Sequence, residues 1–197
     1  MSKTPPIAVS DSPKRAELVG TAWRLFYRDG YHAVGIDTVL AEAGVAKMTL
    51  YKHFPSKEDL IAAVLEERSR QLQANFERAI ESAGRSPTKR LLAIFETLHT
   101  WFHADDFNGC AFIKAVAEYP DPKSSPHRVA VAHKAAFRAR LAILAEELPA
   151  KDAGALANTL MLLTEGAIVA AHVQGRKSAA QEAAEAARIL INAAKRG

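Results

Sequence analysis

The eleven residues from Lys47 to Lys57 carry three lysines, a tyrosine and a histidine, and no acidic side chain. Side chains of these types bind DNA, because lysine pairs with phosphates and guanine acceptors while hydroxyl groups bond to phosphates or base edges. We expect seven residues of this segment to contact DNA: Lys47, Met48, Thr49, Tyr51, Lys52, His53 and Lys57. The chemistry indicated is nucleic-acid binding and not catalysis.

Two short helices, about 36–43 and 47–54, must hold these side chains. Gly44 supplies the tight turn between them, and Val45 and Leu50 are expected to face inward. In a helix-turn-helix the second helix enters the major groove with its N-terminal half against the bases. This geometry makes Lys47, Met48, Thr49 and Lys52 candidate base contacts, and Tyr51, His53 and Lys57 candidate phosphate contacts. The alternative is a solvated basic turn, with the ring of Tyr51 packed on Trp23 or Phe26.

Composition fits a soluble globular protein, with 49% hydrophobic and 24% charged residues among 197. The net charge is +4, and residues 1–57 hold eight basic and five acidic side chains, so most of the excess lies near the N-terminus. Cys110 is the only cysteine, which excludes an intramolecular disulfide and fits a reducing cytoplasm. The first residues lack the apolar core of a signal peptide, and the stretch 160–173 is too short to span a bilayer, so no membrane role is expected.

Helical periodicity dominates the chain, which predicts an all-α fold of about nine helices. The expected helices are Ser12–Asp29 with Ser12 as N-cap, 36–43, 47–54, 57–83, 88–104, 110–118, 126–148, 152–174 and 178–195. Residues 1–11 are expected to form a flexible arm, 12–57 a three-helix DNA-binding domain, 57–83 a connecting helix and 84–197 a regulatory and dimerisation domain. Glycine and proline mark the breaks between these elements.

The N-terminal third resembles the TetR family of bacterial transcriptional regulators. The segments that carry the resemblance are Gly30-Tyr31-His32-Ala33, Val39 to Val45 and Thr49 to Lys57, in the family's order and spacing. Beyond Pro87 the likeness is architectural only. It implies a homodimeric, ligand-responsive regulator, most simply a cytoplasmic repressor that binds a near-palindromic double-stranded DNA operator and is released by a small, partly apolar effector.

The sequence departs from the family pattern at two places. A hydroxyl pair often caps the family's second helix and touches a phosphate, but this chain has Val34 and Gly35. A small residue usually precedes the threonine of the basic helix, whereas here it is Met48, whose apolar side chain can touch a thymine methyl group. We therefore expect DNA contacts that differ from the family pattern at these positions.

The last two helices are predicted to form the dimer interface, because small residues let helices approach closely. The expected contacts are Leu156, Leu160, Leu163, Ala167, Ala171, Ala183, Ala187, Leu190, Ile191 and Ala194. Two such helix pairs related by a two-fold axis would make a four-helix bundle. The alternative is that these stripes fill the core of each subunit.

An apolar cavity with a few polar groups is what a small-molecule effector needs. The candidate lining residues are Trp101, Phe102, Phe107, Cys110, Phe112, His133, Phe137, Met161 and Glu165. Among them Glu165 stands in an apolar surrounding, so its carboxylate needs a partner, which a ligand, His133 or His172 can supply. The alternative is that this aromatic set is plain core.

Other chemistries find little support. His99 and His103 share a helix face and, with Asp106 or His172, would form a weak metal site, so no metal and no cofactor is expected. The sequence has no phosphate loop, nucleophile elbow or zinc-hydrolase motif, which leaves a small helical enzyme as a remote alternative. A DNA-binding regulator controlled by a protein partner or a metal is the nearer one.

Overall fold

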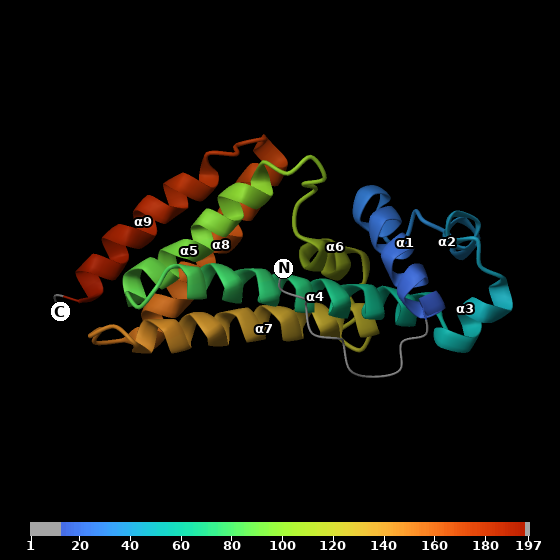
Figure 1. The fold of residues 1–197 in the computed structure, drawn as a ribbon, viewed down its shortest axis with the longest axis horizontal. Helices are drawn as coiled ribbons and strands as arrows, with labels where there is room; N and C mark the ends of the chain where they lie inside the picture. The colour runs from blue at the N-terminus through green and yellow to red at the C-terminus, as the bar shows by residue number, and fades with distance from the viewer. Residues whose placement is uncertain (1–12, 196–197) are drawn as a thin grey trace. The chain divides into compact units, whose positions relative to one another are not determined.

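A computed structural model describes residues 13–195, in which nine α-helices and no strand occur (Figure 1). The all-α prediction is confirmed, while the expected arm at residues 1–11 and the N-cap Ser12 lie outside the described residues. The helices are α1 (Pro13–Asp29), α2 (Ile36–Ala43), α3 (Lys47–His53), α4 (Lys57–Ser82), α5 (Pro87–Phe102), α6 (Ala111–Glu118), α7 (Ser125–Glu146), α8 (Ala153–Gln174) and α9 (Ala179–Ala194). Predicted ends differ from these by one or two residues, as frayed helix termini usually do.

The chain divides into two compact units, one up to Val64 and one from Leu65 onward. The first unit packs α1, α2 and α3 around fully buried side chains such as Leu18, Phe26 and Leu50. Gly44 ends α2 with φ 62°, a left-handed conformation that costs an L side chain energy, and its N–H donates to the Leu40 carbonyl. This turn directs α3 away from α2, as the sequence predicts.

α4 is one continuous helix whose first turns belong to the first unit and whose remainder belongs to the second. Ser56 caps its N-terminus, since its hydroxyl accepts from the Asp59 N–H at 3.1 Å and donates to the Asp59 carboxylate at 2.7 Å. The acidic first turn, Glu58 and Asp59, stabilises the positive end of the helix dipole. The two units are therefore joined by a covalent helix and not by a loop.

The second unit is built on α5, α8 and α9, which pack against one another, with α7 against α8 and α6 against α7 (Figure 1). Its core includes Phe95, Phe102, Leu160 and Ile191, none of them more than about 1% exposed. Gly109 stands before α6 with φ 74°, and a Cβ atom there would lie 2.6 Å from the His172 ring. Only glycine fits this approach of the loop to α8.

Side chains join the second half of α4 to α7, which runs alongside it in Figure 1. Arg140 donates two hydrogen bonds to Glu77, at 2.6 and 2.7 Å. Phe76 packs on Phe137 with ring centroids 5.1 Å apart. A third link joins Ser69 to the His133 ring, 2.9 Å away. These contacts bind the long helix to the body of the second unit.

α8 is apolar around its whole circumference, with one face in the core and another in solvent. Among the described helices it alone is long and apolar enough to cross a membrane by length and composition. Its 22 residues exceed the apolar stretch 160–173, so length alone does not exclude a membrane span. Its packing against α5, α7 and α9 identifies it as a core helix of the second unit.

Candidate functional site

The outer surface of α3 carries the residue types that the sequence assigns to DNA contact. Met48 is 85% exposed and Tyr51 43% exposed, and Lys47 and Lys52 are exposed beside them. Leu50 is fully buried and anchors the helix from the other side. Thr49 and His53 are half-buried, so they lie at the edges of the exposed face and not at its centre.

The alternative prediction is that the Tyr51 ring packs on Trp23 or Phe26, but these two rings have other partners. The ring of Trp23 stacks on Tyr27 at 4.5 Å, and Phe26 packs on Tyr31 at 5.7 Å. With its side chain 43% exposed, Tyr51 projects from α3 instead of filling the core. A large half-exposed aromatic ring beside two exposed lysines is a surface suited to a polyanion.

Two of the lysines are held by neighbours within the first unit. The Lys47 ammonium lies 3.3 Å from a carboxylate oxygen of Asp37, and both side chains are well exposed. An exposed pair of this kind is worth about 0–1 kcal/mol, so it orients Lys47 without removing it from reach of a phosphate. The Lys57 ammonium donates to the His32 carbonyl at 3.3 Å, which ties the start of α4 to the loop before α2.

The N-terminus of α2 has no side-chain cap. Gly35 occupies the N-cap position and Val34, next to it, is buried. The hydroxyl contacts that the family pattern offers here are therefore absent, and only backbone N–H groups of the first turn remain to bind an anion. Asp37 in that same turn does not cap the helix but pairs with Lys47.

The residues predicted to form the dimer interface mostly lie inside the subunit. Seven of the ten are buried in a single chain: Leu156, Leu160, Ala167, Ala171, Ala183, Ala187 and Ile191. Leu163, Leu190 and Ala194 are half-buried. These stripes lie in the contacts of α8 with α5, α7 and α9 within the single chain, and their part in a dimer stays a prediction.

A different stripe of α8 faces solvent. Leu162, Val169 and Val173 are 72%, 45% and 73% exposed, and Ile189 on α9 is 62% exposed. On α8 the exposed Gly166 stands between them, and a Cβ added to it would meet nothing within 4 Å. The spacing of positions 162, 166, 169 and 173 follows one helix face. We call these four residues, Leu162, Gly166, Val169 and Val173, the outer stripe of α8.

The residues predicted to line one effector pocket are dispersed. Phe102 is fully buried, and Phe107 packs edge-on against Trp101 and His172 at 5.1 and 6.3 Å. Phe112 stacks on His133, and Phe137 packs on Phe76. Of the predicted set, Trp101 lines one hollow, and Phe112 and Met161 line another.

Glu165 finds a partner that the sequence did not suggest. Both of its carboxylate oxygens accept from the Lys134 ammonium, at 2.6 and 2.8 Å, where His133 or His172 was expected. The same ammonium lies 3.5 Å from the Cys110 sulfur. Lys134 on α7 is 31 residues away in the chain, and this separation hides the pair from a local reading of the sequence.

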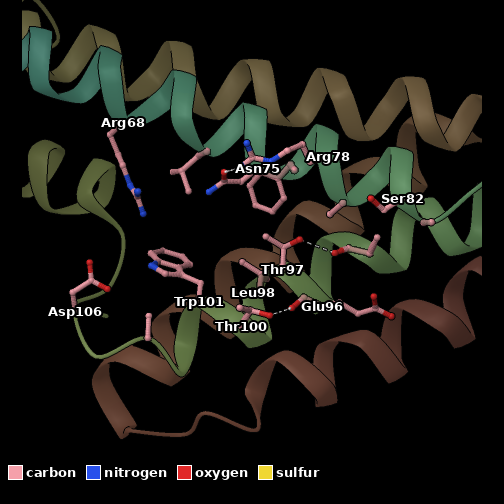
Figure 2. A pocket seen from close by; sticks show the side chains of 16 residues that line it. Arg68, Asn75, Arg78, Ser82, Glu96, Thr97, Leu98, Thr100, Trp101 and Asp106 are labelled. Carbon is pink, nitrogen blue, oxygen red and sulfur yellow. Dashed lines mark hydrogen bonds between the residues drawn. The ribbon is translucent and has the colours of Figure 1, made fainter. Parts of the chain in front are cut away.

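The larger hollow lies between α4 and α5 and has a volume of about 690 Å³ (Figure 2). We call it the α4–α5 cavity. Figure 2 shows the Arg68 side chain extending from α4 toward the Trp101 indole, with Asn75 and Arg78 further along α4 and Asp106 beyond Trp101. Two arginines, two acidic side chains, an amide and an aromatic ring line this space, whose volume is within the range of small-molecule sites.

Most residues of this cavity were missed in the sequence. The α4 side chains that line it include Arg68, Leu72, Asn75 and Ala79, which recur every three or four residues along one helix face. That periodicity is visible in the sequence. Because the stripe mixes charged and apolar types, it does not stand out as a hydrophobic face, and α4 was interpreted only as a connector.

The histidines proposed as metal ligands do not assemble into a site. The His99 and His103 rings lie 4.4 Å apart, but His103 Nδ1 bonds to the His99 carbonyl at 2.8 Å. His172 packs instead on Phe107. Within the described part of the chain, no group of three or more potential ligands could hold a metal ion.

His133 is held in its neutral form. The pKa of His133 is lowered from 6.5 to about 4, first by burial and then by the positive charges of Lys134 and Arg68. Its ring stacks on Phe112 with centroids 3.6 Å apart and bonds to Ser69. As pH falls below 6.5, a proton binds this residue in the unfolded chain before it binds the folded protein.

Acid should therefore destabilise the second unit through His133. The stability linked to this ring is complete above pH 6.5 and is lost as pH falls toward 4. From pH 7 to pH 5 we expect a loss of about 1–2 kcal/mol in the free energy of unfolding, which His133→Phe should abolish. Urea titrations at several pH values measure it. Ser69→Ala, which keeps the titrating ring, is the control, and an unchanged pH slope in His133→Phe would contradict the assignment.

Comparison with known proteins agrees with this geometry. Residues 18–64 match the bacterial regulatory proteins of the tetR family, and residues 87–187 match the tetracycline repressor-like C-terminal domain. The crystal structure of a TetR-family transcriptional regulator from Streptomyces coelicolor is 34% identical, covers 92% of this chain and 96% of its own, and superimposes with a TM-score of 0.87.

Curated relatives match over shorter segments. The transcriptional activator FasR of Mycolicibacterium smegmatis is 34% identical over 47% of this chain and 42% of its own length. The transcriptional repressor DhaR of a Mycobacterium species is 35% identical over 44% of this chain and 46% of its own. The chain thus spans about half the length of the curated relatives that it matches. The two matched domains together with the full-length structural likeness show that the chain belongs to the TetR family of bacterial transcriptional regulators.

Proposed function

We propose that this protein is a homodimeric transcriptional repressor that binds a near-palindromic operator through α3 and is released by a small-molecule effector. The observation that carries the proposal is the exposed face of α3, where Met48, Tyr51 and Lys52 project from a helix anchored by Leu50. A helix that follows a left-handed turn and carries such a face is suited to the major groove.

Each exposed α3 residue is given a role by its chemistry. Lys52 and Lys47 supply positive charge to guanine acceptors or phosphates, and Lys47 exchanges its exposed Asp37 partner for the DNA. Met48, the most exposed of the set, offers an apolar contact to a thymine methyl group. Tyr51 reaches a phosphate with its hydroxyl, which positions α3 without reading sequence.

A second copy of the chain covers the outer stripe of α8. Leu162, Val169 and Val173 are too large and too exposed to remain in water as a contiguous stripe without a partner. Gly166 between them leaves room for close approach of a facing helix. Two α8–α9 pairs packed about a two-fold axis bury this stripe, and a protein partner accounts for the exposed apolar face of α8 without a membrane.

The α4–α5 cavity is the proposed effector site. Its lining includes residues of α4 from Arg68 to Ser82, and the same helix begins at Lys57 in the DNA-binding unit. A ligand that favours one position of this helix therefore biases both units. Because the coupling is reciprocal, an effector that binds the DNA-free form better must weaken operator binding by the same factor.

Repression is the simplest outcome of operator binding, because a dimer bound across a promoter excludes the polymerase without a further contact surface. The relatives do not decide this, since FasR is named an activator and DhaR a repressor.

A gel-shift titration tests the DNA-binding proposal. With DNA from the promoter region adjoining its own gene, the purified protein should give a discrete complex that survives an excess of unrelated competitor DNA. Metabolites that raise the melting temperature of the protein should dissolve that complex, because an effector stabilises the folded state that binds it. Equal affinity for promoter and unrelated DNA would refute sequence-specific regulation.

A further inference from the structure

A second hollow is lined by residues of α6 and α7, and we call it the α6–α7 groove. It has a volume of about 500 Å³, within the range of small-molecule sites, and its walls come from α6, α7 and one residue of α8. Its lining includes Phe112, Val116 and Met161. Ile113 and Val131 at its margin are 41% and 54% exposed, so the groove presents apolar surface to solvent.

The only charges along the groove are positive. Lys134 and Arg138 stand one helical turn apart on α7, and among the described residues that line the hollow none is acidic. The two cations differ in their neighbours. Glu165 holds Lys134 with both oxygens, which neutralises its charge. Arg138 bonds only through Nε, to the Asn158 amide oxygen at 2.7 Å, so within the described residues its two terminal nitrogens have no partner.

The floor of the groove is fixed before any ligand arrives. Phe112 is about 1% exposed and stacks on the His133 ring, with ring centroids 3.6 Å apart and an interplanar angle of 9°. His133 is in turn bonded to Ser69 of α4. A preorganised apolar floor lowers the entropic cost of binding, because few side chains must be ordered when the ligand enters.

We propose that the α6–α7 groove binds a small amphipathic carboxylate, with its apolar tail on Phe112, Val131 and Met161 and its carboxylate on the free edge of Arg138. A guanidinium edge presents two parallel N–H donors, which match the two oxygens of a carboxylate. The absence of acidic lining residues selects against amines. The site is separate from the α4–α5 cavity and does not depend on the proposed role in transcription.

Calorimetric titration of the full-length protein with dodecanoate tests the proposal. The wild type should bind it, and should bind dodecan-1-ol and dodecylamine about tenfold more weakly, because each lacks the carboxylate that pairs with Arg138. Arg138→Gln should weaken dodecanoate binding about tenfold and leave dodecan-1-ol binding unchanged. Ala135→Trp, which fills the groove from α7, should abolish both, while circular dichroism checks that each variant keeps its helices.

Trp101→Ala in the α4–α5 cavity is the matched control and should bind dodecanoate as the wild type does. If Trp101→Ala loses the ligand while Arg138→Gln and Ala135→Trp keep it, the carboxylate binds the other cavity and the proposal is wrong. If the wild type binds none of the three probes and Ala135→Trp changes the oligomeric mass in light scattering, a second copy of the chain covers the groove. That result would equally overturn it.

Discussion

Replacing Leu162 and Val169 together by aspartate should convert the proposed dimer into a folded monomer and weaken operator binding at least about 100-fold. Both side chains belong to the outer stripe of α8, and each carboxylate would have to lose its hydration inside an apolar interface. A monomer brings only one α3 to the DNA. Binding at one half-site therefore no longer strengthens binding at the other. Light scattering gives the mass and gel shift gives the affinity.

The matched control is Ile143→Asp on α7, which changes a similarly exposed apolar residue outside the outer stripe. It should leave both the mass and the affinity unchanged. Because Leu162 is 72% exposed in the single chain, aspartate there creates no cavity, and the melting curve of the double variant should show a cooperative transition. A double variant that stays dimeric would remove the outer stripe from the interface.

Tyr51→Ala should weaken operator binding about 100-fold without unfolding the protein. In a dimer each substitution acts in both half-sites, and two lost contacts of about 1.5 kcal/mol each give that factor. Tyr51 is 43% exposed, so its removal leaves the buried anchor Leu50 in place and the melting temperature nearly unchanged. Fluorescence anisotropy with labelled operator measures the affinity.

Companion variants separate the contributions of ring, hydroxyl and charge. Tyr51→Phe keeps the ring and should lose only the phosphate bond, a smaller effect than Tyr51→Ala. Lys52→Ala should lower affinity for all sequences and reduce the salt dependence of binding by about one phosphate per half-site. Lys14→Ala, an exposed lysine of α1 paired with Glu17, should change neither. Wild-type affinity in Tyr51→Ala would remove Tyr51 from the DNA-binding site.

The α2–α3 region could be predicted from the sequence because its determinants are local. Gly44 and the inward residues Val45 and Leu50 lie within a few positions of one another, and the spacing alone turns Tyr51 and Lys52 outward. Helix ends followed from prolines, glycines and caps such as Ser56. In this region the tertiary packing buries the same residues that the local sequence pattern directs inward.

The second unit could be predicted less well because its choices are set by distant contacts. Apolar residues of α8 occur on more than one face, so periodicity cannot tell the face that packs on α9 from the face left to solvent. Glu165 could not be paired with Lys134 from spacing, since only the packing of α7 on α8 brings them together. The predicted effector residues are mainly aromatic, whereas a stripe of charged, polar and apolar residues of α4 lines the larger cavity.

Hydroxyl-radical footprinting of the wild-type protein on the operator selected by gel shift tests the central claim most directly. Two α3 helices of one dimer should protect two segments on the same face of the duplex, with centres one helical turn apart, about 34–36 Å, and related by an approximate palindrome. Tyr51→Ala should lose both protected segments together. A single protected segment, or uniform protection without a repeated half-site, would contradict a dimer that reads DNA through α3.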